Sequence, residues 1–362
     1  MPTNTPINTP TPGNPSTPVP PPTRPATILG GFIPVTGGET HAIAAGVAHT
    51  CAITPEGGVQ CWGNNNYGQL GDGSYTRSNI RVDVTGLLGA TTIVAGGNHT
   101  CVLAGNEVWC WGLNSKGQIG DGTTANRNTP VKVLSDALEL TAGYDYTCAT
   151  LFSGQVMCWG NNSQGQLADG GQTNQTTPTL ATLFSGISNV DAGRNKTCGL
   201  TSTGLVRCLT SSTSQELGVL PNTNLDVAVN RFGSKIIALI NQGVPVEFLY
   251  DRPKLISQLS GILDVDSGLS HICAMQDSGT VYCWGFNYYG QLGNNSTTRS
   301  ADPVAVTNLS NAWQLAVGKY HACTITTTNE PGDPGIQCWG LNTDGQLGDG
   351  TYQTSLVPVK VK

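Results

Sequence analysis

Apolar and polar residues alternate with a period of two along most of the chain, a pattern that predicts β-strands rather than helices. In Thr50-Cys51-Ala52-Ile53 and Val59-Gln60-Cys61-Trp62 the alternation is regular, as expected for strands with one buried face. The turn-forming residues Pro55-Glu56-Gly57-Gly58 separate these segments, so we expect the two strands to form a hairpin. A further strand, such as Pro130-Val131-Lys132-Val133, precedes the following unit.

Two motifs repeat along the chain and define its units. One motif is Cys61-Trp62-Gly63-Asn64-Asn65-Asn66-Tyr67-Gly68-Gln69-Leu70, and it returns at Cys110, Cys158, Cys283 and Cys338. The other contains a glycine at positions 46, 96, 143, 193, 268 and 318, with spacings of 50, 47, 50, 75 and 50 residues. The gap of 75 residues holds two short units, including a weak copy from Val229 to Ile240, so we count seven.

A unit of this length with about four short antiparallel strands is typical of one propeller blade. Seven such blades close into a ring that has no free sheet edge. The sequence therefore predicts an all-β fold, a seven-bladed β-propeller over residues 39–362. Residues 1–38 are rich in Pro and Thr and predict an extended linker or stalk that is a candidate for glycosylation.

The chain has twelve cysteines, two in each of six units. Reflection of the first hairpin about its turn places Cys51 opposite Cys61, a position that suits a disulfide. Six such bonds, each contributing roughly 2–3 kcal/mol in the loop-closure model, imply an oxidising compartment, extracellular or at the cell surface. Reduced thiols in a cytosolic protein are the alternative, whereas zinc requires more closely spaced ligands. The predicted pairs are Cys51–Cys61, Cys101–Cys110, Cys148–Cys158, Cys198–Cys208, Cys273–Cys283 and Cys323–Cys338.

Charge and hydropathy argue against two classes of partner. The net charge is −6 and the chain contains no run of Lys and Arg, so we expect no nucleic acid partner. No apolar run approaches the roughly 20 residues of a membrane-spanning helix, so we expect no membrane insertion. The first residues show neither the basic nor the apolar region of a signal peptide.

The repeats resemble the regulator-of-chromosome-condensation (RCC1) family, whose unit contains Trp-Gly-x-Asn followed by Gly-Gln-Leu-Gly-x-Gly. Gly68-Gln69-Leu70-Gly71-Asp72-Gly73 and Gly345-Gln346-Leu347-Gly348-Asp349-Gly350 match this motif closely. The resemblance covers about residues 40–362 and implies a seven-bladed propeller of four-stranded blades. It does not imply the nuclear role of the family's namesake, because the basic tail is missing and disulfides are foreign to a nuclear protein. A secreted bacterial-type member is the form that fits.

Most recurring polar and aromatic residues are interpreted as structural. A metal-binding or catalytic histidine would not recur once per blade, so we expect each ring to face a turn and to bond to the backbone. The tryptophans are interpreted as blade packing, and the aspartates of the Gly-Asp-Gly loops as Asx turns rather than calcium ligands. We find no catalytic constellation and expect no enzyme activity, metal or cofactor. The residues concerned are His49, His99, His271 and His321; Trp62, Trp111, Trp159, Trp284 and Trp339; and Asp72, Asp121, Asp169 and Asp349.

The positions that vary between otherwise constant loops are candidates for recognition. Where copies of a unit agree, the fold is a sufficient cause, whereas Tyr and Arg at variable loop tips are typical of binding surfaces. We predict a non-catalytic extracellular binding or adhesion module for a protein or glycan. A structural subunit of a surface layer or filament and an inhibitor of a secreted enzyme are the alternatives. The candidate partner-binding residues are Tyr67, Tyr75, Arg77, Lys116, Arg127, Tyr288, Tyr289, Arg299 and Tyr352.

Two segments are candidates for self-association, the N-terminal residues 1–38 and the fifth unit. The fifth unit has no cysteine and contains the apolar stretch Val244-Pro245-Val246-Glu247-Phe248-Leu249-Tyr250-Asp251. For ring closure, Val357-Pro358-Val359-Lys360-Val361 is expected to pair beside His41-Ala42-Ile43-Ala44. That pairing would leave residues 1–38 outside the ring and available to a neighbouring chain.

Overall fold

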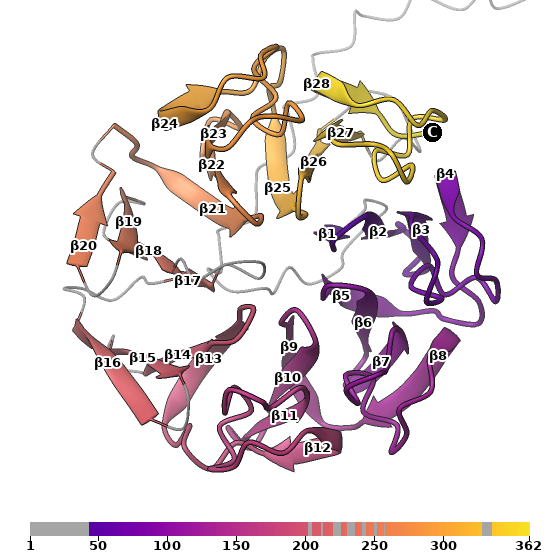
Figure 1. Cartoon of the computed structure of the whole chain (residues 1–362), viewed down its shortest axis with the longest axis vertical. Coiled ribbons are helices and arrows are strands. Elements are labelled where there is room, and N and C mark those ends of the chain that lie inside the picture. Colours follow the sequence, from indigo (N-terminus) through magenta and orange to yellow (C-terminus); the bar gives the residue numbers. More distant parts are fainter. Residues whose placement is uncertain are drawn as a thin grey trace, which may run out of the picture.

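The strands of the chain form seven antiparallel four-stranded sheets, arranged like blades around a central axis (Figure 1). This arrangement comes from a computed structural model, which describes residues 43–201, 205–210, 213–219, 226–229, 236–240, 244–249, 252–256, 258–327 and 335–362. In every sheet four strands that are consecutive in the chain lie side by side, from the inner edge to the rim. The predicted linker of residues 1–38 lies outside the described residues.

The first three sheets contain β1(Ile43–Ala45), β2(His49–Ile53), β3(Val59–Gly63) and β4(Ser78–Asp83); β5(Ala90–Ala95), β6(His99–Ala104), β7(Glu107–Gly112) and β8(Arg127–Leu134); and β9(Ala137–Ala142), β10(Tyr146–Leu151), β11(Val156–Gly160) and β12(Gln175–Leu180). The next two contain β13(Ile187–Ala192), β14(Thr197–Thr201), β15(Leu205–Thr210) and β16(Thr213–Val219); and β17(Asp226–Val229), β18(Ile236–Ile240), β19(Val244–Leu249) and β20(Arg252–Leu255). The last two contain β21(Ile262–Ser267), β22(His271–Gln276), β23(Val281–Gly285) and β24(Ser300–Ala305); and β25(Ala312–Val317), β26(His321–Thr326), β27(Ile336–Gly340) and β28(Ser355–Lys360).

The expectation of seven RCC1-like blades needs correction, because six sheets and not seven contain the disulfide-bridged repeat. The sheet β17–β20 has no cysteine, no Trp-Gly motif and no Gly-Gln-Leu-Gly loop. Its strands pair in register, with Ala238 opposite Val246, but its side chains lie outside the described residues. Six disulfide-bridged sheets therefore share the ring with one sheet that has no cysteine, and one of the six, β13–β16, has Leu209-Thr210 in place of Trp-Gly.

The second and third strands of each repeat form the hairpin that places its two cysteines opposite each other. Cys51 lies opposite Cys61 in the register of β2 and β3, and their Cα atoms are 4.0 Å apart. All twelve cysteines form disulfides, and the six bonds are the pairs that the sequence predicts. The longer separation of 15 residues between Cys323 and Cys338 leaves the strand register unchanged.

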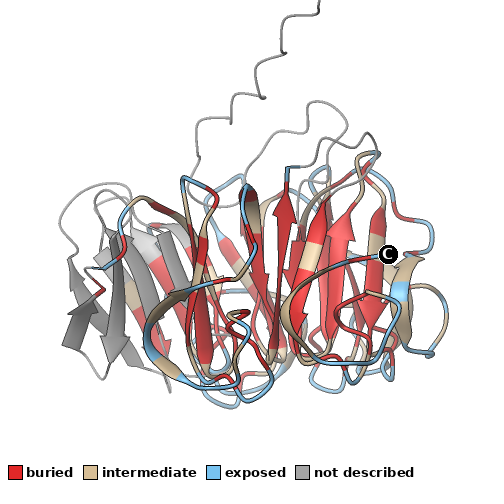
Figure 2. Ribbon diagram, turned by 90° about the horizontal axis from the view of Figure 1, so that it is seen from above, coloured by how far each residue is buried: buried red, intermediate tan, exposed pale blue. Residues whose placement is uncertain are grey.

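The antiparallel order of the strands sorts the loops onto two faces of the ring. The connection from the first to the second strand of a sheet and that from the third to the fourth lie at one face. We call it the motif face, because the loops after Gly46 and after Gly63 contain the two repeated motifs. The hairpin turns and the connections between sheets lie at the opposite face, which we call the hairpin face. Between the two faces the strands of the repeats are largely buried (Figure 2).

The expected ring closure by the C-terminal strand is wrong. β28 is the outermost strand of its own sheet, where Val359 lies opposite Cys338 of β27. The Pro-Val-x-Val segment thus completes the unit that it follows, and the ring needs no strand from the other chain end. Closure uses contacts between complete sheets, since the C-terminus lies beside β4 (Figure 1) and the Lys362 carbonyl accepts a hydrogen bond from the Arg81 backbone at 3.3 Å.

Neighbouring sheets are joined through one backbone carbonyl in each motif loop. The Gln69 carbonyl accepts hydrogen bonds from Thr100 Oγ1 at 3.0 Å and from the indole N–H of Trp111 at 2.9 Å. A carbonyl oxygen has two lone pairs, so both donors of the next sheet are satisfied by one acceptor. Gly71 follows at φ +70°, and a Cβ there would lie 2.7 Å from Trp111 Nε1. We call this arrangement the carbonyl clamp, and it recurs with both donors at Gln118 and Gln346.

A histidine ring extends the carbonyl clamp around the ring. His49 Nε2 lies 3.0 Å from Thr100 Oγ1 of the next sheet, and His321 Nε2 lies 2.9 Å from Thr50 Oγ1 across the ring closure. Because the threonine donates its only proton to the glutamine carbonyl, the imidazole must donate from Nε2, which identifies the tautomer. The partner of Nε2 is therefore a side chain of the next sheet, and not the backbone as expected from the sequence.

The clamp is incomplete around β21–β24. His271 is fully buried, and neither of its ring nitrogens has a hydrogen-bond partner among the described residues. The threonine of the other clamps is replaced by Ala322 in the next sheet. On the other side of the sheet, the buried Trp284 Nε1 also has no partner within the described residues, and the neighbouring sheet β17–β20 has no Gly-Gln-Leu-Gly loop.

The replacement Ala322→Thr should therefore increase stability. A threonine hydroxyl there would accept from His271 and donate to the Gln291 carbonyl, which now receives only the Trp339 indole among the described residues. We expect the free energy of unfolding to rise by about 0.5–1.5 kcal/mol, measured by denaturant titration under non-reducing conditions. The matched control Thr100→Ala, which breaks an existing clamp, should lower it by about 1–3 kcal/mol. A destabilised Ala322→Thr protein would contradict the clamp.

The buried histidines should make the propeller sensitive to mild acid. Burial lowers the pKa of His321 to about 3, and it lowers that of His271 to about 3 with a smaller contribution from His321. The unfolded chain takes up these protons near the ordinary pKa of 6.5. The contribution of the two neutral histidines to the free energy of unfolding is therefore fully present above pH 6.5 and is lost as the pH falls toward 3.

Between pH 7 and pH 4.5 we therefore expect the thermal midpoint to fall. The variant His321→Tyr should reduce this fall, because a tyrosine, which does not titrate in this range, already occupies the slot as Tyr146. Scanning calorimetry of both proteins at the two pH values measures the difference. An equal fall in both proteins would show that His321 does not contribute.

Candidate recognition surface

A buried asparagine anchors each motif loop from within. The amide nitrogen Nδ2 of Asn65 donates to Asp72 Oδ1 at 3.1 Å, while its oxygen accepts from the Leu70 backbone at 3.0 Å. The Asp72 carboxylate in turn accepts from the backbone and hydroxyl of Ser74, at 2.9 Å each. The expected Asx turn is therefore present. Asn114, Asn162 and Asn342 do the same with Asp121, Asp169 and Asp349, whereas Asn287 donates to the amide oxygen of Asn294.

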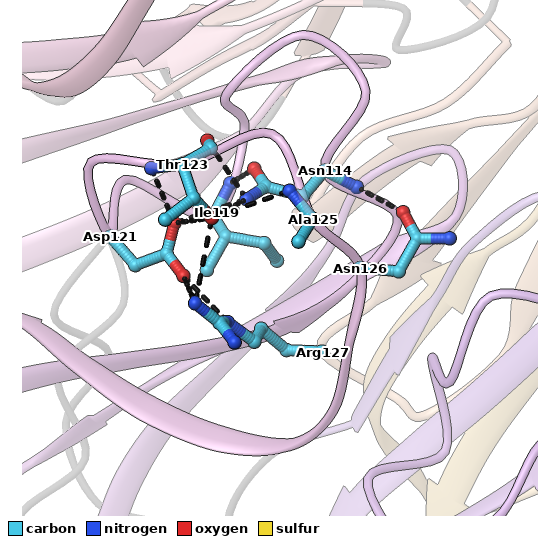
Figure 3. A network of polar contacts seen from close by, with 7 residues as sticks. All are labelled: Asn114, Ile119, Asp121, Thr123, Ala125, Asn126 and Arg127. Atoms are coloured by element: carbon cyan, nitrogen blue, oxygen red, sulfur yellow. Dashed lines mark hydrogen bonds and ion pairs between the residues drawn. The ribbon is translucent and has the colours of Figure 1, made fainter.

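The loop that follows β7 adds an ion pair to this frame (Figure 3). Arg127 Nε and Nη2 both lie 2.6 Å from Asp121 Oδ2, and Thr123 donates to Oδ1. Burial by itself raises the pKa of Asp121, but hydrogen bonds from Thr123 and Arg127 outweigh it, so the pKa lies below its ordinary value. Arg127, a predicted partner-binding residue, lies at the start of β8, and its guanidinium pairs with Asp121 in the loop that precedes this strand.

The other candidate residues lie on the motif face, with their side chains exposed. They come from the loops between the third and fourth strands of four sheets, so residues that are far apart in the sequence share one surface. Tyr288 is the most exposed of the tyrosines, at 72%. The residues placed together in this way are Tyr67, Tyr75, Arg77, Lys116, Tyr288, Tyr289, Arg299 and Tyr352.

Arg77 and Tyr352 meet where the last sheet joins the first. The Arg77 guanidinium carbon lies 4.7 Å from the centroid of the Tyr352 ring, and Nη1 donates to the Thr343 carbonyl at 3.2 Å. Asp344 lies 3.9 Å from the same guanidinium. These contacts are exposed and each contributes little to stability, but they fix the side chain of Arg77 across the closure.

Two pairs of aromatic rings lie on this face where β21–β24 meets β25–β28. The Phe286 and Tyr288 ring centroids are 5.6 Å apart, the Tyr289 and Tyr320 centroids are 5.2 Å apart, and Lys319 Nζ lies 4.9 Å from the Tyr320 centroid. We call these five residues the aromatic platform. Sequence reasoning missed Phe286, Tyr320 and Lys319. Phe286 occupies the variable third position of Trp-Gly-x-Asn, and Lys319 and Tyr320 precede the histidine of the other motif, so both positions could have been compared between units.

A second mixed group surrounds Tyr144 in the loop between β9 and β10. The Arg194 guanidinium carbon lies 5.5 Å from the centroid of the Tyr144 ring. Burial raises the pKa of Asp145, and Lys116 and Arg194 oppose this effect. Burial and the Asp145 charge raise the pKa of Tyr144. Gln118 Nε2 donates to Asp145 at 3.3 Å, so this carboxylate has a partner within the fold.

The hairpin face differs in character. Its exposed large apolar residues stand on separate loops, with Leu88 and Phe152 the most exposed. Isolated apolar residues of this kind are ordinary on protein surfaces. No group of three or more His, Cys, Asp or Glu residues that could hold a metal ion occurs in the part of the chain that the structure describes. Among those residues there is also no helix long and apolar enough to cross a membrane.

A family model for the RCC1-like domain matches residues 34–362. The chain belongs to this family. The ultraviolet-B receptor UVR8 of Arabidopsis thaliana is 35% identical over 119 residues, which cover 31% of this chain and 26% of the receptor. The E3 ubiquitin-protein ligase HERC2 of Homo sapiens is 29% identical over 153 residues, which cover 37% of this chain and 3% of the ligase. The matched regions thus span about a quarter or less of these relatives.

Two solved structures support the fold of this RCC1-like propeller. Human WBSCR16 aligns with a TM-score of 0.50 at 23% identity, over 80% of this chain and 73% of that chain. Yeast RCC1 (Prp20), solved with Kap60 bound, aligns with a TM-score of 0.51 at 19% identity, over 89% of this chain and 75% of that chain. At such identities the similarity concerns the fold alone.

The ion pair in Figure 3 gives a direct test of how the motif loops are held. Replacement of Arg127 by Gln should raise the pKa of Asp121, because the carboxylate loses a cationic donor and keeps only the hydrogen bonds from Thr123. A carbon-13 NMR titration of the carboxyl group measures the change. The exposed variant Arg77→Gln serves as the control and should leave Asp121 unaffected. An unchanged pKa in Arg127→Gln would refute the pairing.

Proposed function

We propose that this RCC1-like propeller is a non-catalytic binding module whose motif face engages a protein or glycan. One observation carries the proposal: seven of the ten tyrosines of the chain lie in loops of this face. Tyrosine provides a large, amphipathic contact area at low entropic cost, which is why recognition loops favour it. The tyrosines concerned are Tyr67, Tyr75, Tyr144, Tyr288, Tyr289, Tyr320 and Tyr352.

The frame beneath these side chains supports the same function. The asparagine anchors, the Asx turns and the carbonyl clamps hold the loops before any partner arrives. A rigid scaffold lowers the conformational entropy that binding must overcome. The family supports binding as well, since yeast RCC1 (Prp20) was solved with Kap60 bound.

We further propose that the module works outside the cell or at the cell surface, for example in adhesion. Six disulfides with no free cysteine favour an oxidising compartment. The net charge of −6 disfavours a nucleic acid as the partner. A structural subunit of a surface layer or filament is the second candidate. The chain enters the first sheet at Ile43, at the hairpin face and opposite the tyrosines. Contacts between subunits through opposite faces suit a filament better than an enzyme inhibitor.

The test is capture of a partner from the native envelope or culture fluid on immobilised protein. A variant with Tyr67→Ser, Tyr75→Ser and Tyr352→Ser should capture at least about tenfold less partner than the wild type, because exposed aromatic anchors contribute most of the binding energy. The matched control replaces Leu88 and Phe152 of the hairpin face with Ser and should capture as the wild type does. Loss of capture in the control alone would move the binding site to the other face and overturn the proposal.

A further inference from the structure

The aromatic platform is held in place before any ligand is present. The Phe286 backbone N–H donates to the Ser270 carbonyl at 2.9 Å, and that of Tyr289 donates to Gln291 Oε1 at 2.9 Å. Gly290 packs so closely on β28 that a Cβ would lie 2.5 Å from a side-chain carbon of Leu356. The loop of one sheet is thus fixed against the next sheet, and the rings at the junction keep their spacing.

The exposure of these rings indicates a surface that a ligand would cover. Phe286, Tyr288 and Tyr289 are 42%, 72% and 41% exposed, although their neighbours in the chain, Gly285 and Asn287, belong to the rigid frame. The rings of each pair are tilted, with centroids 5.6 Å and 5.2 Å apart, so that they present faces as well as edges. Covering exposed rings removes apolar surface from water, which favours binding. Lys319 is the only charged side chain of the platform.

Proline-rich segments in polyproline II conformation are the ligands that such surfaces suit best. They dock on aromatic-lined grooves, because proline rings stack on aromatic faces, and the preformed extended helix loses little entropy on binding. A strongly charged ligand suits the platform less well, since Lys319 is its only ion. The chemistry therefore favours an extended, nearly uncharged, proline-rich peptide.

This chain contains such a segment. Residues 1–30 include ten prolines, with the run Pro18-Val19-Pro20-Pro21-Pro22, and their only charged side chain is Arg24. We propose that residues 1–30 of one molecule dock on the aromatic platform of a second copy. The inference rests on the proposed binding function of the motif face and names its ligand.

The positions of the two partners in the fold favour docking between molecules. The chain enters the first sheet at Ile43, and β1 then runs toward Gly46 and the motif face. Its entry point therefore lies at the hairpin face, opposite the platform. The 42 residues before Ile43 could span about 130 Å at roughly 3.1 Å per residue, enough to reach a neighbouring ring. A contact between opposite faces is heterologous, and it generates open chains of subunits unless a ring closes.

The first experiment measures binding of a synthetic peptide with the sequence of residues 1–30 to the full-length protein by calorimetry. We expect saturable binding that weakens about tenfold or more in Tyr288→Ser, because the most exposed anchor is lost. Phe152→Ser, which replaces an exposed aromatic residue of the hairpin face, is the matched control and should bind within about twofold of the wild type. A peptide with its prolines replaced by serine should not bind. Equal binding by Tyr288→Ser and the wild type would overturn the proposal.

The second experiment tests the head-to-tail geometry by light scattering on full-length proteins. The wild type should form species that grow with concentration and are dispersed by excess peptide. The platform variant Tyr288→Ser and a tail variant with Pro18, Pro20, Pro21 and Pro22 replaced by Ser should each be monomeric. An equimolar mixture of the two should form dimers and nothing larger, because only one intact tail and one intact platform remain per pair.

Each remaining outcome has a defined meaning. A wild type that stays monomeric while its tail variant binds the peptide would show docking within one molecule and overturn the proposal of a second copy. A protein that captures a partner through the motif face but binds no peptide would overturn this inference and leave the proposed function intact. Loss of both activities would count against the binding function itself.

Discussion

The ring depends on a backbone carbonyl of the motif loop, which at Gln69, Gln118 and Gln346 serves two donors of the next sheet. The Gln69 carbonyl receives the Thr100 hydroxyl and the Trp111 indole, so three groups that would be costly to bury alone satisfy one another. The glycine that follows is required by its positive φ and by the indole that lies on it. The residues that recur in each repeat therefore stabilise contacts between neighbouring sheets as well as the fold within one sheet.

The same interaction explains how the ring closes and where it is weakest. Thr50 and Trp62 of the first sheet donate to the Gln346 carbonyl of the last, so closure uses the ordinary clamp and no exchanged strand. Around β21–β24 the clamp loses members, and His271 and Trp284 are left buried without hydrogen-bond partners among the described residues. Buried polar groups without partners lower stability, so the interactions between sheets are unevenly distributed around the ring.

The residues proposed for recognition occupy other positions than this frame. Asn65 and its counterparts form hydrogen bonds with the polar groups inside the motif loops. The residues between the recurring positions, such as Tyr288, project into solvent. Substitution at these positions leaves the clamps intact. A repeat protein can thus vary its exposed loop residues while its fold remains unchanged.

The sequence by itself determined the strand alternation, the hairpins and the six disulfides, because these depend on contacts within one unit, as between Cys51 and Cys61. It also located most of the exposed tyrosines, since variation between copies marks positions that the fold does not use. Contacts between units were decided only by the tertiary structure. The partner of His49 and the meeting of Tyr289 with Tyr320 join neighbouring sheets. The place of β28 and the ion pair of Arg127 lie within one unit and also required the structure, because they depend on the path of the chain between the third and fourth strands. Periodicity fixes which residues recur, whereas the angle and spacing of neighbouring sheets decide which of them meet.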